Sequence, residues 1–278
     1  MLRSALVVGL DSQIGAALVR TLRARGVHVR GTRHSDVPGQ PDATQLDLAV
    51  SLDDWQPARV ECGFLCAGLT SVAACERNPR LSHRVNVDAQ VEVAKRLTES
   101  GAHVVFLSTN MVFDGSKPLR QADEPTCPTT VYGAHKAEAE QQLQQLGDRV
   151  TVLRLTKVLT REHPLLHDWK TALQRGEAIH PFSDVVLAPV AMDQVVEALS
   201  RLADEPSGGI FQLSGDRDVS YAQVALALGH DPHLVQPISG AYQYPTQPPM
   251  HTTLDVSGLR QRGMHVRATQ QTLEAVCR

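Results

Sequence analysis

The chain has 278 residues, of which 42% are hydrophobic and 21% charged, and its formal net charge at pH 7 is −3. Its 27 Lys and Arg against 30 Asp and Glu leave no basic excess, which argues against a nucleic-acid-binding protein. No segment reaches the roughly 18 apolar residues of a membrane span, so we expect no membrane partner. We expect one or two domains and, because residues 1–8 lack the pattern of a signal peptide, a cytoplasmic location.

The cysteines and histidines indicate neither a disulfide framework nor a metal site. The five cysteines are odd in number and form no Cys-x-x-Cys pair. Among twelve histidines, only His163 and His167 stand at a ligand-like spacing, and Pro164 between them disfavours a regular helix. We therefore predict no metal ligands.

A strand, a glycine loop and a helix are expected at the start of the chain. Residues 5–8 form a short apolar run typical of a buried parallel strand, and the helix that follows the loop at 9–15 has a period of four in its apolar residues. Such a unit binds a pyrophosphate, because glycines admit backbone amides and the helix N-terminus is positive. The predicted cofactor contacts here are Gly9, Asp11, Ser12, Gln13, Ile14 and Gly15.

Ser12 departs from the usual loop, because it stands where a Gly-x-x-Gly-x-x-Gly pattern has its middle glycine. Either serine tolerates the backbone geometry there or its hydroxyl bonds a phosphate. A structural turn without a ligand is the alternative for the whole loop.

The second and third expected strands, residues 27–30 and 45–48, bear on the choice of cofactor. NAD-binding proteins place an acid after the second strand, whereas this chain has Arg30 and Arg33. NADP is therefore favoured, with NAD left open. Asp47 and Leu48 are candidates to meet the adenine region, and the alternative for Asp47 is a helix cap for residues 51–55.

Small and polar residues follow the next two expected strands, residues 60–66 and 103–107. Cys66, Ala67 and Gly68 would admit a nicotinamide ribose, and Ser108 and Thr109 would come directly off the fifth strand. Both ends lie at the sheet edge where doubly wound folds bind ligands. Asn86 is a poor helix former inside an expected helix that runs to about residue 100, which indicates another role.

Tyr132 and Lys136 are spaced for proton transfer. Residues four apart share one helix face, so the ammonium can favour the phenolate, while the Thr109 hydroxyl could hold a carbonyl oxygen. The alternative is an exposed tyrosine and a solvated lysine.

Five motifs together resemble the extended short-chain dehydrogenases/reductases, in the dTDP-4-dehydrorhamnose reductase-like, sugar-nucleotide-binding branch. They lie at residues 9–15, 73–79, 85–87, 108–115 and 128–136. The resemblance implies an α/β fold: a doubly wound parallel (Rossmann) sheet with a smaller C-terminal substrate lobe. Residues 1–155 would form the dinucleotide-binding domain, joined by strand 210–214, and residues 156–278 would mainly form the lobe.

The resemblance also implies the reaction, an NADP-dependent reduction of a keto group on a nucleotide-linked or related sugar. The implied catalytic residues are Thr109, Tyr132 and Lys136, with Ser108 in support. Ser108, Tyr132, Lys136, Cys66 and Asn86 join the implied cofactor contacts.

Asn110 and Met111 stand where the reductases that the chain resembles commonly have an Asp-Tyr pair. Related 4,6-dehydratases have an Asp-Glu acid/base pair there, so water elimination is disfavoured. The alternatives left open are a sugar-nucleotide epimerase with bound NAD and a non-catalytic NADP-binding regulatory subunit, the second of which is favoured by the departures at Ser12, Asn110 and Met111. A homodimer is also left open.

The C-terminal half offers candidates for the substrate. Strands are expected at 150–155 and 210–213, a helix at 192–202 and a loop at 237–249, where Tyr242 and Tyr244 would line a sugar pocket or pack against the lobe. The candidates for contact with a substrate diphosphate are the polar residues between 156 and 189, namely Arg161, His163, His167, Trp169, Lys170, Arg175, His180 and Asp184.

Overall fold

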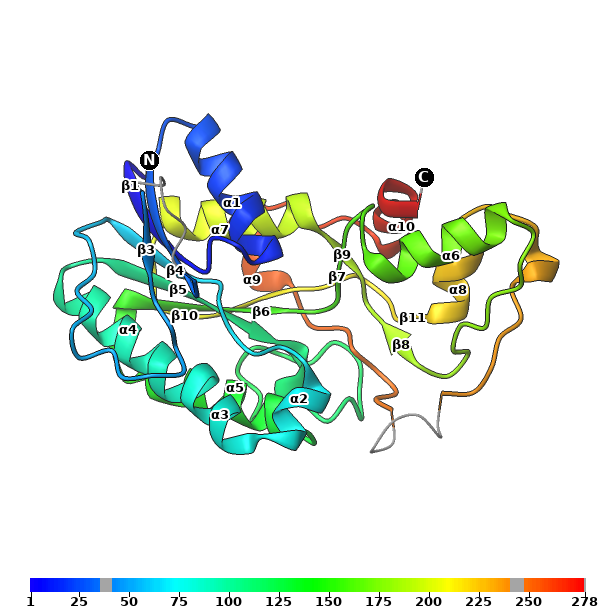
Figure 1. Cartoon of the computed structure of the whole chain (residues 1–278), viewed down its shortest axis with the longest axis horizontal. Coiled ribbons are helices and arrows are strands. Elements are labelled where there is room, and N and C mark those ends of the chain that lie inside the picture. Colours follow the sequence, from blue (N-terminus) through cyan, green and yellow to red (C-terminus); the bar gives the residue numbers. More distant parts are fainter. Residues whose placement is uncertain (36–41, 241–247, 278) are drawn as a thin grey trace. The chain divides into compact units, whose positions relative to one another are not determined.

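The fold is built on a seven-stranded sheet, most of whose strands are labelled in Figure 1. The computed structural model describes residues 1–35, 42–240 and 248–277. The sheet strands are β1 (Ser4–Val8), β2 (His28–Arg33), β3 (Ala43–Gln45), β4 (Cys62–Leu65), β5 (His103–Thr109), β6 (Val150–Leu155) and β10 (Gly209–Leu213). Their order across the sheet is β10-β6-β5-β4-β1-β2-β3. The expected α/β doubly wound fold is confirmed.

The sheet reverses its winding between β1 and β4. The chain first builds outward from β1 to β2 and β3, then crosses back to place β4 on the other side of β1, and both neighbours of β1 run parallel to it. Val8 at the end of β1 is level with Thr32 on one side and Leu65 on the other. The loops that leave these three strands therefore open into one crevice, the usual ligand position in such sheets.

Helices cover both faces of the sheet. The longer helices are α1 (Gln13–Ala24), α4 (Ala89–Glu99), α5 (Val131–Gln144), α6 (Pro164–Gln174), α7 (Met192–Asp204) and α10 (Thr269–Cys277). The short ones are α2 (Val72–Arg77), α3 (Pro79–His83), α8 (Tyr221–Leu226) and α9 (Ser257–Gln261), and short strands lie at β7 (Val158–Leu159), β8 (Val186–Leu187), β9 (Val190–Ala191) and β11 (Val219–Ser220). In Figure 1, α1 lies over one face of the sheet, and α4 and α5 lie over the other.

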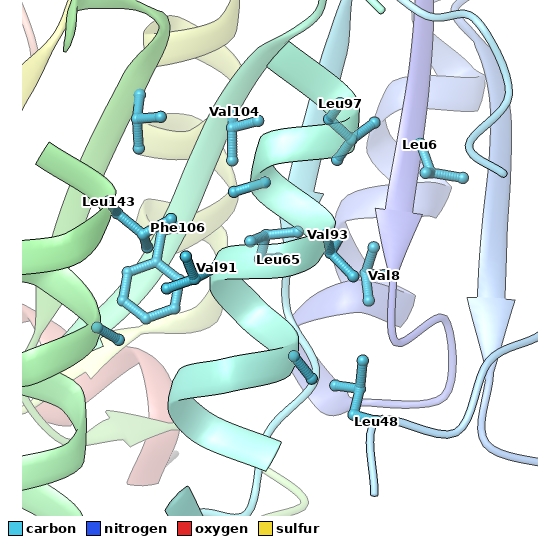
Figure 2. Close-up of a cluster of buried hydrophobic side chains, with 14 of the residues drawn as sticks. Leu6, Val8, Leu48, Leu65, Val91, Val93, Leu97, Val104, Phe106 and Leu143 are labelled. Atoms are coloured by element: carbon cyan, nitrogen blue, oxygen red, sulfur yellow. The ribbon is translucent and has the colours of Figure 1, made fainter. Parts of the chain in front are cut away.

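The core between α4 and the sheet is built mainly from apolar side chains. Figure 2 shows Val91, Val93 and Leu97 of α4 facing the side chains of β1, β4 and β5, among them Leu65 and Phe106. These side chains are less than 5% exposed. At roughly 1.5–3 kcal/mol for each buried large apolar side chain, this face supplies much of the free energy that holds the crevice strands in register.

Two compact units emerge from the packing. The first comprises residues 1–112, 125–154 and 196–211 and contains most of the sheet, and the second comprises residues 113–124, 155–195 and 212–278. The second unit has its own apolar cluster, in which Trp169 and Tyr221 meet edge to face with ring centroids 6.4 Å apart. The functional division at residue 155 stays a prediction.

Several predicted elements differ in extent. The third strand ends at Gln45 rather than reaching residue 48, because the Asp47 carboxylate accepts a hydrogen bond from the Ala49 amide and turns the chain. Residues 51–55 form no helix, so Asp47 does not cap one. Ser108 and Thr109 are the last residues of β5 rather than residues that follow it. Tyr242 and Tyr244 lie outside the described residues.

A buried ion pair fixes α5 to the sheet. Arg154 of β6 donates from Nε and Nη2 to the Glu140 carboxylate of α5, at 3.1 Å and 2.7 Å to Oε2, and the two side chains are 2% and 3% exposed. Removing one partner of such a pair leaves a buried charge uncompensated.

We expect Glu140→Gln to lower the free energy of unfolding by about 3–5 kcal/mol, because it leaves the Arg154 guanidinium buried without a charged partner. Glu197→Gln is the matched control: its i,i+4 pair with Arg201 is 43% and 42% exposed, and the loss should stay below about 1 kcal/mol. Urea denaturation at pH 7 measures both. Equal losses for the two variants would contradict the assigned role of the buried pair.

Candidate functional site

The loop after β1 is shaped by Gly9 and Ser12. Gly9 has φ +92°, and a Cβ there would lie 2.8 Å from the Ala67 nitrogen, so only glycine fits. Ser12 has φ −68° and needs no glycine. Its Oγ accepts from the Gly15 amide at 3.0 Å and donates to the Gly9 carbonyl at 2.8 Å, so it caps α1. The departure from the glycine pattern is therefore a helix cap, and the hydroxyl is engaged within the loop.

A cavity of about 490 Å³ opens at the crevice between the loops of β1, β2 and β4. Eight of the predicted cofactor contacts line it, namely Gly9, Asp11, Ser12, Arg33, Asp47, Leu48, Ala67 and Gly68. The other predicted contacts do not belong to its described lining: Gln13, Ile14, Gly15, Cys66, Asn86, Ser108, Tyr132 and Lys136.

The lining also includes residues that the sequence analysis missed: Thr32, His34, Leu46, Ala49, Leu69, Leu81 and Val85. Thr32 and His34 could have been found from their neighbour Arg33 at the end of β2. Leu81 and Val85 stand one helical turn apart and reach the cavity from the segment that contains α3, which no local pattern marks as a ligand wall.

Arg33 is the cation that the cavity offers to a ligand. Its Nε is buried and has no hydrogen-bond partner within the described structure, which is costly for a guanidinium unless a ligand completes it. Beside it, His34 Nδ1 lies 3.4 Å from the Asp47 carboxylate. Arg30, the other predicted arginine, is exposed and three positions earlier on the strand, so its side chain leaves from the opposite face.

Thr109 and α5 meet through the turn that follows β5. The Thr109 Oγ1 accepts from the Met111 amide at 3.2 Å and keeps its own proton to donate. A Cβ on Gly133 would lie 2.1 Å from the Met111 carbonyl oxygen, so glycine is required for α5 to approach this turn. Thr130 caps the helix by accepting from the Gly133 amide at 3.0 Å. Together these contacts fix the first turn of α5, which carries Tyr132, beside the end of β5.

Tyr132 and Lys136, hereafter the helix pair, stand one turn apart on α5; Lys136 is buried and Tyr132 is partly exposed. Burial lowers the pKa of Lys136 to about 7, while the Glu140 carboxylate and Cys66 act in the opposite direction. The Lys136 ammonium lies 3.8 Å from the centroid of the Phe106 ring, a contact that favours its charged form.

Burial raises the pKa of Tyr132, with a smaller contribution from Cys75. Lys136 does not contribute to this shift, so the lowering of the Tyr132 pKa that the sequence predicted is not found. A phenol with a raised pKa stays protonated at neutral pH, so Tyr132 is suited to donate a proton.

The predicted helix around Asn86 contains a π-helical turn at Arg84–Asp88. The Asn86 side chain is 1% exposed, accepts from the Leu69 amide at 2.9 Å and donates to the Leu69 carbonyl at 2.9 Å. Asn86 therefore holds the cavity wall that leaves β4. Cys66 precedes this wall and is close enough to Lys136 for the ammonium to lower its thiol pKa, although burial raises that pKa to about 12 overall.

The polar candidates of the second unit have varied surroundings. Trp169 belongs to the apolar cluster, Arg161 donates to the Ala275 carbonyl at 2.8 Å, and Asp184 accepts from the Gly240 amide at 2.6 Å. His163 precedes α6, and its Nδ1 is buried without a partner within the described structure. None of these positions selects a substrate by itself.

Across residues 1–35, 42–240 and 248–277, no group of three or more His, Cys, Asp or Glu residues is placed to hold a metal ion. In the same part of the chain, no helix has both the length and the apolar character needed to cross a membrane.

Lys136 generates a prediction about stability and pH. Its pKa is lowered on folding, so between about pH 7 and pH 10 the unfolded chain holds more protons than the folded one, and stability rises with pH at up to about 1.4 kcal/mol per unit. We expect Lys136→Met to remove this rise and to be at least as stable as the natural chain at pH 6. Denaturation at pH 6, 8 and 9.5 tests it, with the exposed Lys95→Met as control. A pH slope unchanged in Lys136→Met would count against the assignment.

Comparison with known proteins places this site in a family. The RmlD substrate binding domain model matches residues 3–278. The chain is 27% identical to the probable low-salt glycan biosynthesis reductase Agl14 of Haloferax volcanii, covering 97% of this chain and 94% of that protein. It is 24% identical to the methionine adenosyltransferase 2 subunit beta of Pongo abelii, covering 95% and 84%.

Among solved structures, the dTDP-4-dehydrorhamnose reductase of Bacillus anthracis in complex with NADP superposes with a TM-score of 0.86 at 19% identity, covering 99% of each chain. The family match over nearly the whole chain agrees with the motifs and with the seven-stranded sheet. The chain belongs to the RmlD substrate binding domain family, within the extended short-chain dehydrogenases/reductases that its motifs resemble.

Proposed function

We propose that this protein is an NADP-dependent oxidoreductase that reduces a keto group of a nucleotide-linked or related sugar. The observation that carries the proposal is that Thr109 and the helix pair belong to the same compact unit as the cavity. Lys136 neighbours Cys66, which directly precedes the cavity wall at Ala67. A ligand that extends from the cavity past Ala67 would therefore approach Lys136, and with it the acid of Tyr132 and the hydroxyl of Thr109.

The cavity fits a dinucleotide phosphate in two respects. The glycine loop and the capped N-terminus of α1 suit a pyrophosphate, and the unpartnered Nε of Arg33 suits an additional phosphate on the ribose. The Bacillus anthracis reductase named above was solved with NADP, which supports the same choice, and NAD remains the second option. When bound, the cofactor would supply the hydride.

The chain's own residues would handle the proton and the carbonyl oxygen. The Thr109 hydroxyl would donate to the substrate oxygen and orient it, and the Tyr132 phenol would give its proton to that oxygen as the carbonyl is reduced. The charged form of Lys136 would stabilise the resulting phenolate across one helical turn. We also propose the sugar nucleotide as substrate class and the cytoplasm as location; the homodimer stays a prediction of the sequence.

A cofactor-binding subunit without turnover is the second candidate. It is favoured by the similarity to the methionine adenosyltransferase 2 subunit beta and by Met111, which departs from the usual reductase motif. Ser12 no longer favours it, since the serine caps α1 and preserves the loop. The retained helix pair supports the enzyme over the subunit.

We expect Tyr132→Phe to reduce turnover at least about 100-fold, because the proton donor is lost, while NADPH still binds. The assay follows NADPH absorbance at 340 nm with a panel of 4-keto sugar nucleotides, and cofactor binding is measured separately by fluorescence titration. Phenylalanine keeps the ring, so packing on α5 is preserved. Full turnover in this variant would refute the mechanism, and no turnover by the natural chain on any substrate would refute the proposed substrate class.

We expect Arg33→Gln to weaken NADPH binding by about 10-fold or more and to leave NADH binding within about twofold, because only the extra phosphate faces the guanidinium. Arg30→Gln is the matched control: it removes an equal charge from the same strand but from outside the cavity. Titration of both cofactors against the three proteins gives the comparison. If both variants weaken NADPH binding equally, Arg33 acts only through its contribution to the net charge.

A further inference from the structure

A chain of buried and partly buried side-chain hydrogen bonds connects the cavity wall to α5. It begins at Asn86, which bonds the amide and the carbonyl of Leu69. The next residue is Ser82 of α3, which is fully buried and whose Oγ accepts from Asn86 Nδ2 at 3.2 Å. The Ser82 Oγ in turn lies 2.8 Å from His135 Nδ1. His135 stands on α5 between the two members of the helix pair. The chain therefore runs from the wall of the cavity to the proton-transfer helix.

The direction of each hydrogen bond follows from its neighbours. The Asn86 amide donates to the Leu69 carbonyl at 2.9 Å and to Ser82 at 3.2 Å, with a longer contact to Cys75 Sγ at 4.0 Å. Ser82 is thus an acceptor from Asn86, and His135 Nδ1 is the one acceptor that the described residues offer to its own buried proton, so we take Ser82 as the donor to His135. That nitrogen must then be unprotonated, which places the imidazole proton on Nε2 and leaves the ring neutral.

His83 helps to keep His135 neutral. The His83 ring meets the His135 ring edge to face, with centroids 5.2 Å apart, and is itself held by Glu138 at 3.1 Å and Asp88 at 3.3 Å. These two carboxylates outweigh burial and raise the pKa of His83. Burial, and then the charge of His83, lower the pKa of His135.

The charged and titratable groups that act on His135 come from four elements: His83 of α3, Glu138 of α5, Asp88 of the π-helical turn and Glu76 of α2. The three carboxylates favour its protonation, but they do not offset burial and His83. The pKa of His135 therefore lies below the ordinary histidine value of about 6.5, and the ring is neutral at pH 7.

We propose that His135 is a positioning residue: its unprotonated Nδ1 accepts the Ser82 hydroxyl and thereby ties the cavity wall at residues 67–69 to the helix that carries the helix pair. Protonation of His135 puts a donor where the serine needs an acceptor. The buried Ser82 proton then has no acceptor among the described residues, so the hydroxyl must turn, which disturbs its bond to Asn86 and loosens the wall. The part of this proposal that concerns catalysis rests on the proposed reductase function.

Amide hydrogen exchange at Leu69 tests the proposal without cofactor or substrate, because the Leu69 amide donates to Asn86 Oδ1. Loss of one buried hydrogen bond corresponds to about a three- to tenfold change. We expect the protection factor of Leu69, corrected for the intrinsic rate, to fall by about that factor from pH 7.5 to pH 5.5 in the natural chain. It should stay constant in His135→Gln, whose amide oxygen can accept from Ser82 but does not titrate.

His28→Gln, at an exposed histidine of β2, is the matched control and should behave as the natural chain does. Ser82→Ala should lower Leu69 protection at both pH values. A fall in protection that is equal in the natural chain and in His135→Gln overturns the proposal, and so does an imidazole nitrogen spectrum that places the proton of His135 on Nδ1.

Cofactor binding provides the second readout. Between pH 8 and pH 5.5 the Kd for NADPH should rise about three- to tenfold more in the natural chain than in His135→Gln, since the titration of the cofactor phosphate is common to both. Identical rises would contradict the positioning role. Failure of every variant to bind NADPH would instead contradict the proposed function, while the exchange and nitrogen measurements would still decide the tautomer.

Discussion

The burial of the Lys136 ammonium is the constraint on which the site depends. A lysine in this position is costly enough to bring its pKa to about 7, and the structure offsets the cost with the Phe106 ring on one side and Glu140 one helical turn further along. Glu140 would itself be an uncompensated buried carboxylate without the guanidinium of Arg154. Arg154 of β6 therefore stabilises the Glu140 carboxylate, and Glu140 in turn favours the charged form of Lys136. Because each of these side chains is buried, α5 has one position on the sheet, and that position sets the place of Tyr132.

Close backbone approach and helix capping do the rest of the positioning. Gly133 lets α5 touch the Met111 carbonyl, and Gly9 lets the phosphate loop touch the backbone of Ala67. Ser12 and Thr130 cap the two helices that face the ligand edge, so the loops before α1 and α5 have defined ends. A rigid edge of this kind suits a reaction that needs a carbonyl, a phenol and a cofactor aligned within hydrogen-bonding distance.

Much of this arrangement could be predicted from the sequence, because the positions of the strands along the chain and of the loops after them follow from the alternation of apolar runs and glycines. Arg33 could be identified for the same reason. The features that could not be predicted depend on contacts between segments that are far apart in the sequence or on local loop geometry. The Ser12 cap needs the geometry of its loop, the raised pKa of Tyr132 results from burial by distant segments, and the bond between Ser82 and His135 joins helices 53 positions apart in the chain. The early end of β3 was missed because a side-chain hydrogen bond of Asp47 outweighs the strand pattern of residues 45–48.

Hydride transfer is the central claim of this account, and isotope transfer tests it most directly. The protein would be incubated with NADPH deuterated at the transferable position and with a 4-keto sugar nucleotide, and the product analysed by mass spectrometry. The account predicts one deuterium on the reduced carbon for each NADP formed. An unlabelled sugar nucleotide with unchanged cofactor, despite demonstrated NADPH binding, would contradict it and favour the cofactor-binding subunit.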